Sequence, residues 1–78
     1  MRTIYSFRTQ RGTARIIYDS GKRRFHAVFG DESLGSYHAP EQAAEDLAVG
    51  HTLSHSSGID LSTLGIPEEL GEWQRVTW

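Results

Sequence analysis

Apolar and polar residues alternate with a period of two in several short segments of the first half of the chain. This alternation, with many β-branched and aromatic residues, is typical of β-strands and predicts strands over residues 3–8, 13–18 and 24–29. A short fourth strand is predicted over 34–37. Only a few residues separate these segments, and connections this short join neighbouring strands into an antiparallel meander. In the second turn, Gly21 allows a positive φ.

The same alternation divides the predicted strands between two faces. One set of side chains is apolar throughout and is expected to face the core: Tyr5, Phe7, Ala14, Ile16, Tyr18, Phe25, Ala27 and Phe29. The opposite set places arginines among β-branched residues: Ile4, Ser6, Arg8, Thr13, Arg15, Ile17, Arg24, His26 and Val28. This second face is expected either to be a solvated, basic surface or to be half covered by the C-terminal tail.

Residues 40–49 carry the one strong helix signal in the sequence. Pro40 suits the first helical position, where its missing N–H needs no partner, and Gly50 suits the left-handed end. Ala39 supplies no side-chain oxygen for the N-cap. Small apolar residues recur at helical spacing, so the helix is expected to lie close against the sheet. This apolar stripe consists of Ala43, Ala44, Leu47 and Ala48.

The C-terminal part of the chain has little periodicity. Residues 51–60 are rich in Ser, His and Gly and predict a loop, and loops of this length in small domains are commonly functional or disordered. Apolar residues return in the tail, 61–78, which includes one predicted short helical turn at 67–70. Because a tryptophan beside leucines is typical of packing, the tail is expected to return to the core, anchored by Leu64, Leu70 and Trp73.

Together these elements predict a single α+β domain over residues 1–78. Its core is a three-stranded antiparallel meander with a short fourth strand, packed on one face by one main helix and followed by an irregular tail. The chain has no cysteine, which excludes disulfides and thiolate metal sites and agrees with a reducing compartment. The sequence has neither an apolar run of about 20 residues nor the apolar stretch of a signal peptide. We therefore expect a cytoplasmic protein that does not bind membranes.

The formal net charge is −2 at pH 7, but the charges are unevenly distributed along the chain. Residues 1–24 contain seven of the eight basic residues and one acidic residue, whereas residues 25–78 contain one basic residue and nine acidic ones. Such an asymmetry indicates either an anion-binding surface or two parts that neutralise each other across the folded domain.

Histidines and serines in the predicted loop are the candidates for catalytic or metal chemistry. His51 and His55 are four residues apart, which suits a metal site on a helix, but no helix is expected there and no third ligand has a supporting spacing. Ser54, His51 and Asp60 could be combined as a hydrolytic triad, but a polar loop fixes neither the base nor an oxyanion hole. We therefore predict no catalytic residue, no metal and no cofactor, and a protein that is not an enzyme.

The passage from the last predicted strand into the helix, Leu34-Gly35-Ser36-Tyr37-His38-Ala39-Pro40-Glu41-Gln42-Ala43-Ala44, resembles that of the plant ethylene-response-factor DNA-binding domain. The order of three strands and a helix is also similar to the amino-terminal arm-binding domain of tyrosine-type phage integrases. In both families the sheet contacts DNA, and the resemblance implies the same contact here. These strands lack the dense Arg and Trp pattern with which the plant domain reads bases. The whole chain also resembles a group of short bacterial proteins of unknown function, which implies no site residues.

These observations predict a small binding module. The favoured partner is another protein, bound by the 51–60 loop or by an exposed edge strand. The alternative is a nucleic acid, bound across the basic face of the sheet with arginines toward the bases and the second turn toward the phosphates. The candidate nucleic-acid-binding residues are Arg8, Arg11, Arg15, Lys22, Arg23 and Arg24. The sequence predicts no particular oligomeric state.

Overall fold

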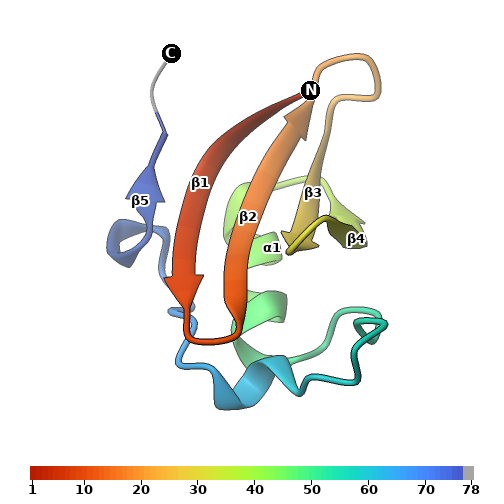
Figure 1. Cartoon of the computed structure of the whole chain (residues 1–78). Coiled ribbons are helices and arrows are strands. Elements are labelled where there is room, and N and C mark those ends of the chain that lie inside the picture. Colours follow the sequence, from red (N-terminus) through yellow and green to blue (C-terminus); the bar gives the residue numbers. More distant parts are fainter. Residues whose placement is uncertain (77–78) are drawn as a thin grey trace.

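A computed structural model of the chain describes residues 1–76. It is a small α+β domain in which a curved antiparallel sheet is packed against one α-helix (Figure 1). The elements in chain order are β1 (Arg2–Thr9), β2 (Gly12–Asp19), β3 (Arg24–Phe29), β4 (Glu32–Tyr37), α1 (Pro40–Val49), the 3₁₀ helices η1 (Leu61–Thr63) and η2 (Leu70–Glu72), and β5 (Gln74–Arg75).

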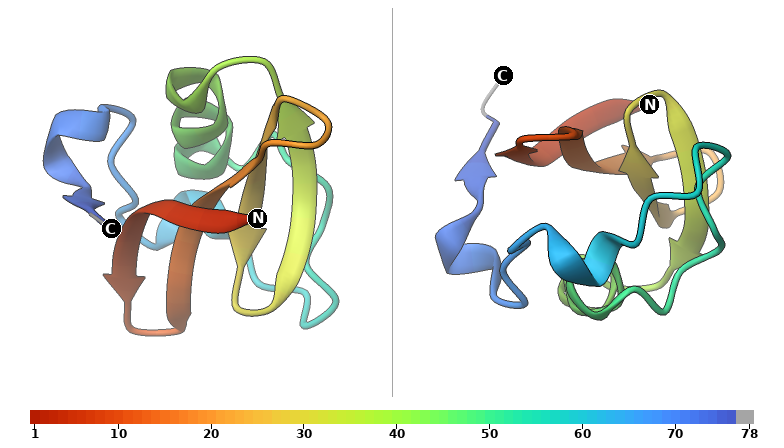
Figure 2. Two further views of the ribbon diagram at one scale, coloured as in Figure 1. Left: turned by 90° about the horizontal axis from the view of Figure 1, so that it is seen from above. Right: turned by 60° about the horizontal axis from the view of Figure 1, so that its bottom comes forward.

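The sheet has the strand order β4-β3-β2-β1-β5. The first four strands form the predicted meander, and every neighbouring pair is antiparallel. After β4 the chain passes through α1, the loop and the two 3₁₀ helices, and then returns to the first strand. There Tyr5 and Ser6 of β1 pair with Arg75 and Gln74 of β5. Figure 2 shows the sheet curving around the side on which α1 and η1 lie.

The sequence predicted three strands with a short fourth, and this number was too low, because the sheet has five strands. The fourth strand covers Glu32–Tyr37 rather than 34–37, and it begins directly after Gly30 and Asp31. A register shift in its pairing with β3, between Ala27 and Val28, lets Leu34 enter the core although Glu32 and Ser33 already belong to the strand. The fifth strand has two residues, which is too short to produce any alternation in the sequence.

The second turn also differs in detail from its prediction. Arg23, with φ 53°, has the left-handed conformation there, and Gly21 does not. The Asp19 carboxylate accepts the N–H groups of Gly21 and Lys22, at 3.1 and 3.3 Å. These bonds fix the first half of the turn, so the reversal of φ occurs one residue after Lys22.

The helix has the predicted bounds, Pro40–Val49. Ala39 is extended and makes no side-chain capping bond, and Gly50 ends the helix in the left-handed conformation at φ 76°. The Tyr37 hydroxyl reaches across from β4 and donates to the Asp46 carboxylate at 2.9 Å. Burial and this neighbouring carboxylate raise the pKa of Tyr37 to about 12.

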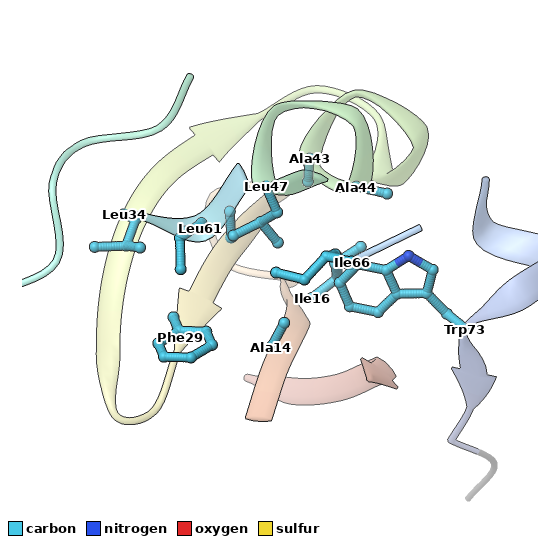
Figure 3. Close-up of a cluster of buried hydrophobic side chains, with 11 residues drawn as sticks. Ala14, Ile16, Phe29, Leu34, Ala43, Ala44, Leu47, Leu61, Ile66 and Trp73 are labelled. Carbon is cyan, nitrogen blue, oxygen red and sulfur yellow. The ribbon is translucent and has the colours of Figure 1, made fainter. Parts of the chain in front are cut away.

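The core lies between the sheet and α1, and the tail closes its open side. Its largest fully buried side chains are Phe29, Ile16, Leu34 and Leu47. In Figure 3, Trp73 reaches from the tail to the vicinity of Ile66 and Ile16. Trp73 is 5% exposed, and its indole N–H donates to the carbonyl of Pro67 at 2.8 Å. Leu64 and Leu70 are partly buried against the same cluster. The last two residues of the predicted tail, 77–78, lie outside the described residues.

The tail packs on the core side of the sheet, so it does not cover the outer face. Arg8 and Ser36 are exposed there, and Arg15, Ile17 and His26 are half-buried. Two residues predicted on this face depart from it: Val28 is buried, and Ile4, at a register shift between Thr3 and Tyr5, packs against the core cluster. Of the two alternatives for the outer face, the structure therefore supports the solvated one. Among residues 1–76, no helix has the length and apolar character that crossing a bilayer requires.

Candidate interaction site

The six candidate cations occupy three places in the fold. By the register of the sheet, Arg8, Arg15 and Arg24 belong to its outer face. Arg11 lies in the turn between β1 and β2. Lys22 and Arg23 lie in the turn between β2 and β3, at the opposite end of these strands (Figure 1). The structure thus brings three of the six onto one face and separates the two turns.

Two of the outer-face arginines are held by their neighbours. The Arg15 guanidinium donates to the carbonyl of Gly30 at 2.7 Å and lies 3.5 Å from the Asp31 carboxylate. Arg24 donates to the hydroxyl and the carbonyl of Ser36, at 3.1 and 3.2 Å, and contacts His38 at 3.3 Å. Both guanidinium groups therefore use some of their N–H donors for bonds within the protein, so fewer donors remain for a phosphate.

The turn with Lys22 and Arg23 is organised by Asp19. Besides the two N–H groups of the turn, this carboxylate contacts His26 on the neighbouring strand at 3.4 Å. Burial acts to raise the pKa of Asp19, but the bonds from His26 and from the turn outweigh it and lower the pKa below its usual value. Lys22 and Arg23 themselves are exposed.

Arg8 and Arg11 differ from Arg15 and Arg24, because their guanidinium groups have no ion pair and no hydrogen bond within residues 1–76. The hydroxyl of Thr9, between them, donates to the carbonyl of Gly12 at 2.7 Å and accepts the N–H of Arg11 at 3.1 Å. These bonds stabilise the turn and thereby fix the main-chain position of Arg11. Both arginine side chains are exposed.

Next to these two arginines, the edge of β1 is open. β5 pairs with only two residues of β1, Tyr5 and Ser6, and its chain runs from there toward Ile4, where the Val76 N–H donates to the Ile4 carbonyl at 2.9 Å. The remaining end of β1, Phe7 to Thr9, has no strand beside it on this edge within residues 1–76. Because Thr9 and Gly12 close the hairpin, alternation directs the main-chain N–H and C=O of Arg8 toward the open edge.

A groove of about 770 Å³ runs beside this open edge. One wall is the end of β1 with the following turn, residues 7–11, and the other wall is the segment 63–65. Phe7 and Leu64 are both partly buried against the core and supply apolar surface to the groove. An exposed edge strand could be expected from the sequence, but this groove could not, because its second wall comes from the unpatterned tail.

The other edge of the sheet is partly covered by the predicted loop. The Leu53 N–H donates to the carbonyl of Leu34 on β4 at 2.9 Å, and the Ser56 N–H donates to the Glu32 carboxylate at 3.0 Å. Hydrogen bonds from Ser56 lower the pKa of Glu32 below its usual value. A smaller hollow of about 260 Å³ lies beneath the loop. The loop is thus attached to the sheet, which makes it a less accessible docking element than the edge of β1.

The polar residues of the loop form a local cluster around His55. Its Nδ1 atom lies 2.8 Å from the Ser57 hydroxyl and accepts the Ser57 N–H at 3.1 Å, and its Nε2 atom lies 3.9 Å from Glu32. The Ser57 N–H therefore competes for the lone pair that a catalytic base would need. The imidazole ring of His55 packs edge-on against the ring of Phe29, with centroids 5.4 Å apart. This contact indicates a structural role for His55.

The other histidine and serine candidates are not brought together. Asp60 caps η1 by accepting the N–H and the hydroxyl of Ser62, at 3.0 and 2.6 Å, and these bonds lower its pKa. No hydrogen bond or ion pair within the described chain joins Asp60 to His51 or Ser54. Among residues 1–76, no three His, Asp or Glu side chains are placed to hold a metal ion.

The acidic part of the chain makes little direct contact with the charges of the basic part. Within residues 1–76, the contact of Arg15 with Asp31 is the sole ion pair between an arginine or lysine and a carboxylate. The exposed Glu41 and Glu45 lie on α1, and Glu68 and Glu69 lie in the tail. Direct ion pairing between the two parts is therefore limited to Arg15 and Asp31 among the described residues.

Comparisons of this chain with protein-family models, with curated proteins and with solved structures gave no match.

Proposed function

We propose that this protein is a small, non-enzymatic binding module that recognises an extended segment of another protein by strand addition. The single observation that carries the proposal is the open edge at the end of β1. Main-chain groups on an exposed edge form hydrogen bonds with an incoming strand, and neighbouring pockets select its side chains. The edge at Phe7 to Thr9 offers these groups beside a groove, whereas the opposite edge of the sheet is occupied at Leu34 by the loop.

The length of the site fits a short segment. Beyond Ser6, the main-chain groups of Arg8 are the next on β1 to face the open side, and the turn at Gln10 and Arg11 ends the strand. A bound segment would pair with β1 beyond Trp73, the residue before β5, whose ring packs on Phe7 with ring centroids 6.0 Å apart. Few hydrogen bonds are available there, so most of the affinity has to come from side chains in the groove, and we expect a weak, reversible complex.

A selection from a displayed library of random peptides, followed by two variants of Arg8, tests the proposal. Arg8→Pro removes the N–H that points to the open edge while leaving the ladder to β2 intact, since proline is tolerated on that side of an edge strand. Arg8→Gln keeps this N–H. Under the proposal, selected peptides shift the amide NMR signals of Phe7, Arg8 and Thr9, and Arg8→Pro lowers their binding more than Arg8→Gln does.

The stability of both variants is measured alongside binding, because Arg8→Pro must remain folded for the comparison to hold. Equal binding by a folded Arg8→Pro variant would show that the peptides do not add to β1. A library that yields no binder would count against a peptide-binding function altogether.

A second candidate function is nucleic-acid binding across the outer face of the sheet. The observation that favours it is the common face of Arg8, Arg15 and Arg24, which agrees with the resemblance to DNA-binding domains that read DNA with a sheet. The internal bonds of Arg15 and Arg24 argue against it, and so does the acidic remainder of the chain, because such domains are usually basic overall.

A further inference from the structure

The groove beside the open edge of β1 combines apolar walls with unpaired positive charge. Phe7 belongs to one wall and Leu64 to the other, and Arg8 and Arg11 also belong to its lining. Its volume of about 770 Å³ lies within the range of roughly 300–1,000 Å³ that is common for ligand sites. The hollow under the loop, by contrast, is lined by neither arginine nor lysine, and the hollow beside Met1 and Tyr18 contains one arginine, Arg2.

The two arginines are available for a partner. Each is exposed, and neither guanidinium forms an ion pair or a hydrogen bond with residues 1–76. By contrast, Arg15 and Arg24 are bonded to their neighbours on the same sheet. An arginine beside an apolar wall is favourably placed to bind a carboxylate, because its donors form charge-assisted hydrogen bonds in partly desolvated surroundings.

From this charge complementarity we infer that the partner of the β1 edge is an extended, acidic segment in which carboxylates alternate with apolar residues. The inference rests on the proposed function, since it names the chemistry of the segment that adds to the strand. Phe7 faces the core side and Arg8 faces the outer side. In an added strand, the residue opposite Arg8 therefore also points outward, and its neighbours point toward the groove.

The resulting pattern has one acidic residue opposite Arg8, flanked by apolar residues whose side chains enter the groove near Phe7 and Leu64. Arg11, in the turn beyond Thr9, adds a second cation at that end of the groove. A further carboxylate on the side of the segment nearest this turn is therefore recognised as well. A basic segment is rejected by the same two arginines.

Two blocked synthetic peptides test the inference, one alternating valine with glutamate and one alternating valine with glutamine. Each is titrated into the labelled full-length protein at low salt and followed by amide NMR signals. We expect the glutamate peptide to shift the signals of Phe7, Arg8, Thr9 and Leu64. The glutamine peptide should bind roughly three- to tenfold more weakly, which corresponds to the loss of two exposed charge pairs.

Three variants provide the matched comparison. Arg8→Gln and Arg11→Gln each remove one charge at the groove, and Lys22→Gln removes one charge at the opposite end of the sheet. We expect the first two to weaken the glutamate peptide roughly two- to fivefold with little effect on the glutamine peptide, and Lys22→Gln to change neither.

Equal affinity for the two peptides, unchanged in Arg8→Gln and Arg11→Gln, would overturn the acidic preference and leave strand addition intact. Shifts centred on Lys22 and Arg23 instead of Phe7 to Thr9 would also overturn it, because they would indicate general attraction of anions. If library-selected peptides bind in an Arg8→Pro-sensitive way and the glutamate peptide does not bind at all, the inferred chemistry is wrong while the proposed function stands.

Discussion

At the scale of single residues, Leu47 illustrates how α1 is held. It is fully buried, and the neighbouring helical positions that face the sheet are the equally buried alanines Ala43 and Ala44. Small residues let the helix approach the sheet closely, and Leu47 fills the remaining space together with Ile16 and Phe29. One large side chain thus supplies much of the apolar contact between helix and sheet.

We expect Leu47→Ala to lower the free energy of unfolding by about 2–5 kcal/mol, since it removes buried methyl groups and leaves a cavity. Chemical denaturation followed by circular dichroism measures the change. Val49→Ala in the same helix is the matched control, because Val49 is 38% exposed and its truncation should cost no more than about 0.5 kcal/mol. Identical denaturation midpoints for Leu47→Ala and the unsubstituted protein would contradict the packing described for α1.

Local signals also explain which details the sequence could predict at this scale. The bounds of α1 follow from Pro40 and Gly50, which act on their own backbone regardless of the rest of the fold. The conformation of the second turn does not follow from its glycine. Asp19 fixes the N–H groups of Gly21 and Lys22, and the left-handed residue is then Arg23, where only the surrounding structure can select it.

At the scale of elements, the long strands and the helix have repeating patterns, whereas β5 and the loop do not. β5 pairs with β1 because Trp73, the residue before it, is buried in the core and brings the chain to that edge. A strand of two residues is too short to show a periodicity from which this pairing could be predicted. The candidate site arises because β1 has eight residues and its neighbour β5 has two, so part of the edge of β1 is left without a paired strand.

The attachment of the loop to β4 should depend on pH through Glu32. Hydrogen bonds from Ser56 favour the carboxylate, so the pKa of Glu32 in the folded protein lies below its ordinary value of 4.5. For a group with a lowered pKa, the stabilisation is present above the ordinary value and is lost as the pH falls through the lower, folded value. We therefore expect the loop to loosen only below about pH 4.5.

The amide NMR shift of Ser56, followed from neutral pH to about pH 2, reports this transition directly. Its midpoint should lie below 4.5, the ordinary value for a glutamate. Glu32→Gln should abolish the transition, while Glu45→Gln, on the exposed face of α1, should leave it in place. A transition that persists in Glu32→Gln would assign the attachment of the loop to another group.

At the scale of the whole molecule, the uneven distribution of charge along the sequence places most basic and most acidic residues on different elements of the fold. Six of the eight basic residues belong to β1, β2 and the turns that follow them, Arg24 begins β3 and Arg75 lies in β5, whereas most acidic residues belong to α1 and the tail. This much could be predicted, because a meander places the first 24 residues in adjacent strands. The sequence could not predict which cations remain free, since the bonds of Arg15 and Arg24 depend on main-chain and side-chain groups of other strands and turns.

This distribution determines how the protein should respond to DNA. With Arg15 and Arg24 engaged and the acidic residues repelling phosphates, we expect a short mixed-sequence duplex to bind only non-specifically, at about 10⁻⁴–10⁻⁶ M or weaker. Amide NMR spectra at low salt should show small shifts around Lys22 and Arg23, reversed by added salt, and Lys22→Gln should reduce them. Shifts across Ser6, Arg15 and Ile17 that depend on the DNA sequence would point the other way. They would mean that contact with bases outweighs the internal bonds of the arginines, and the outer face, rather than the edge of β1, would then be the principal binding site.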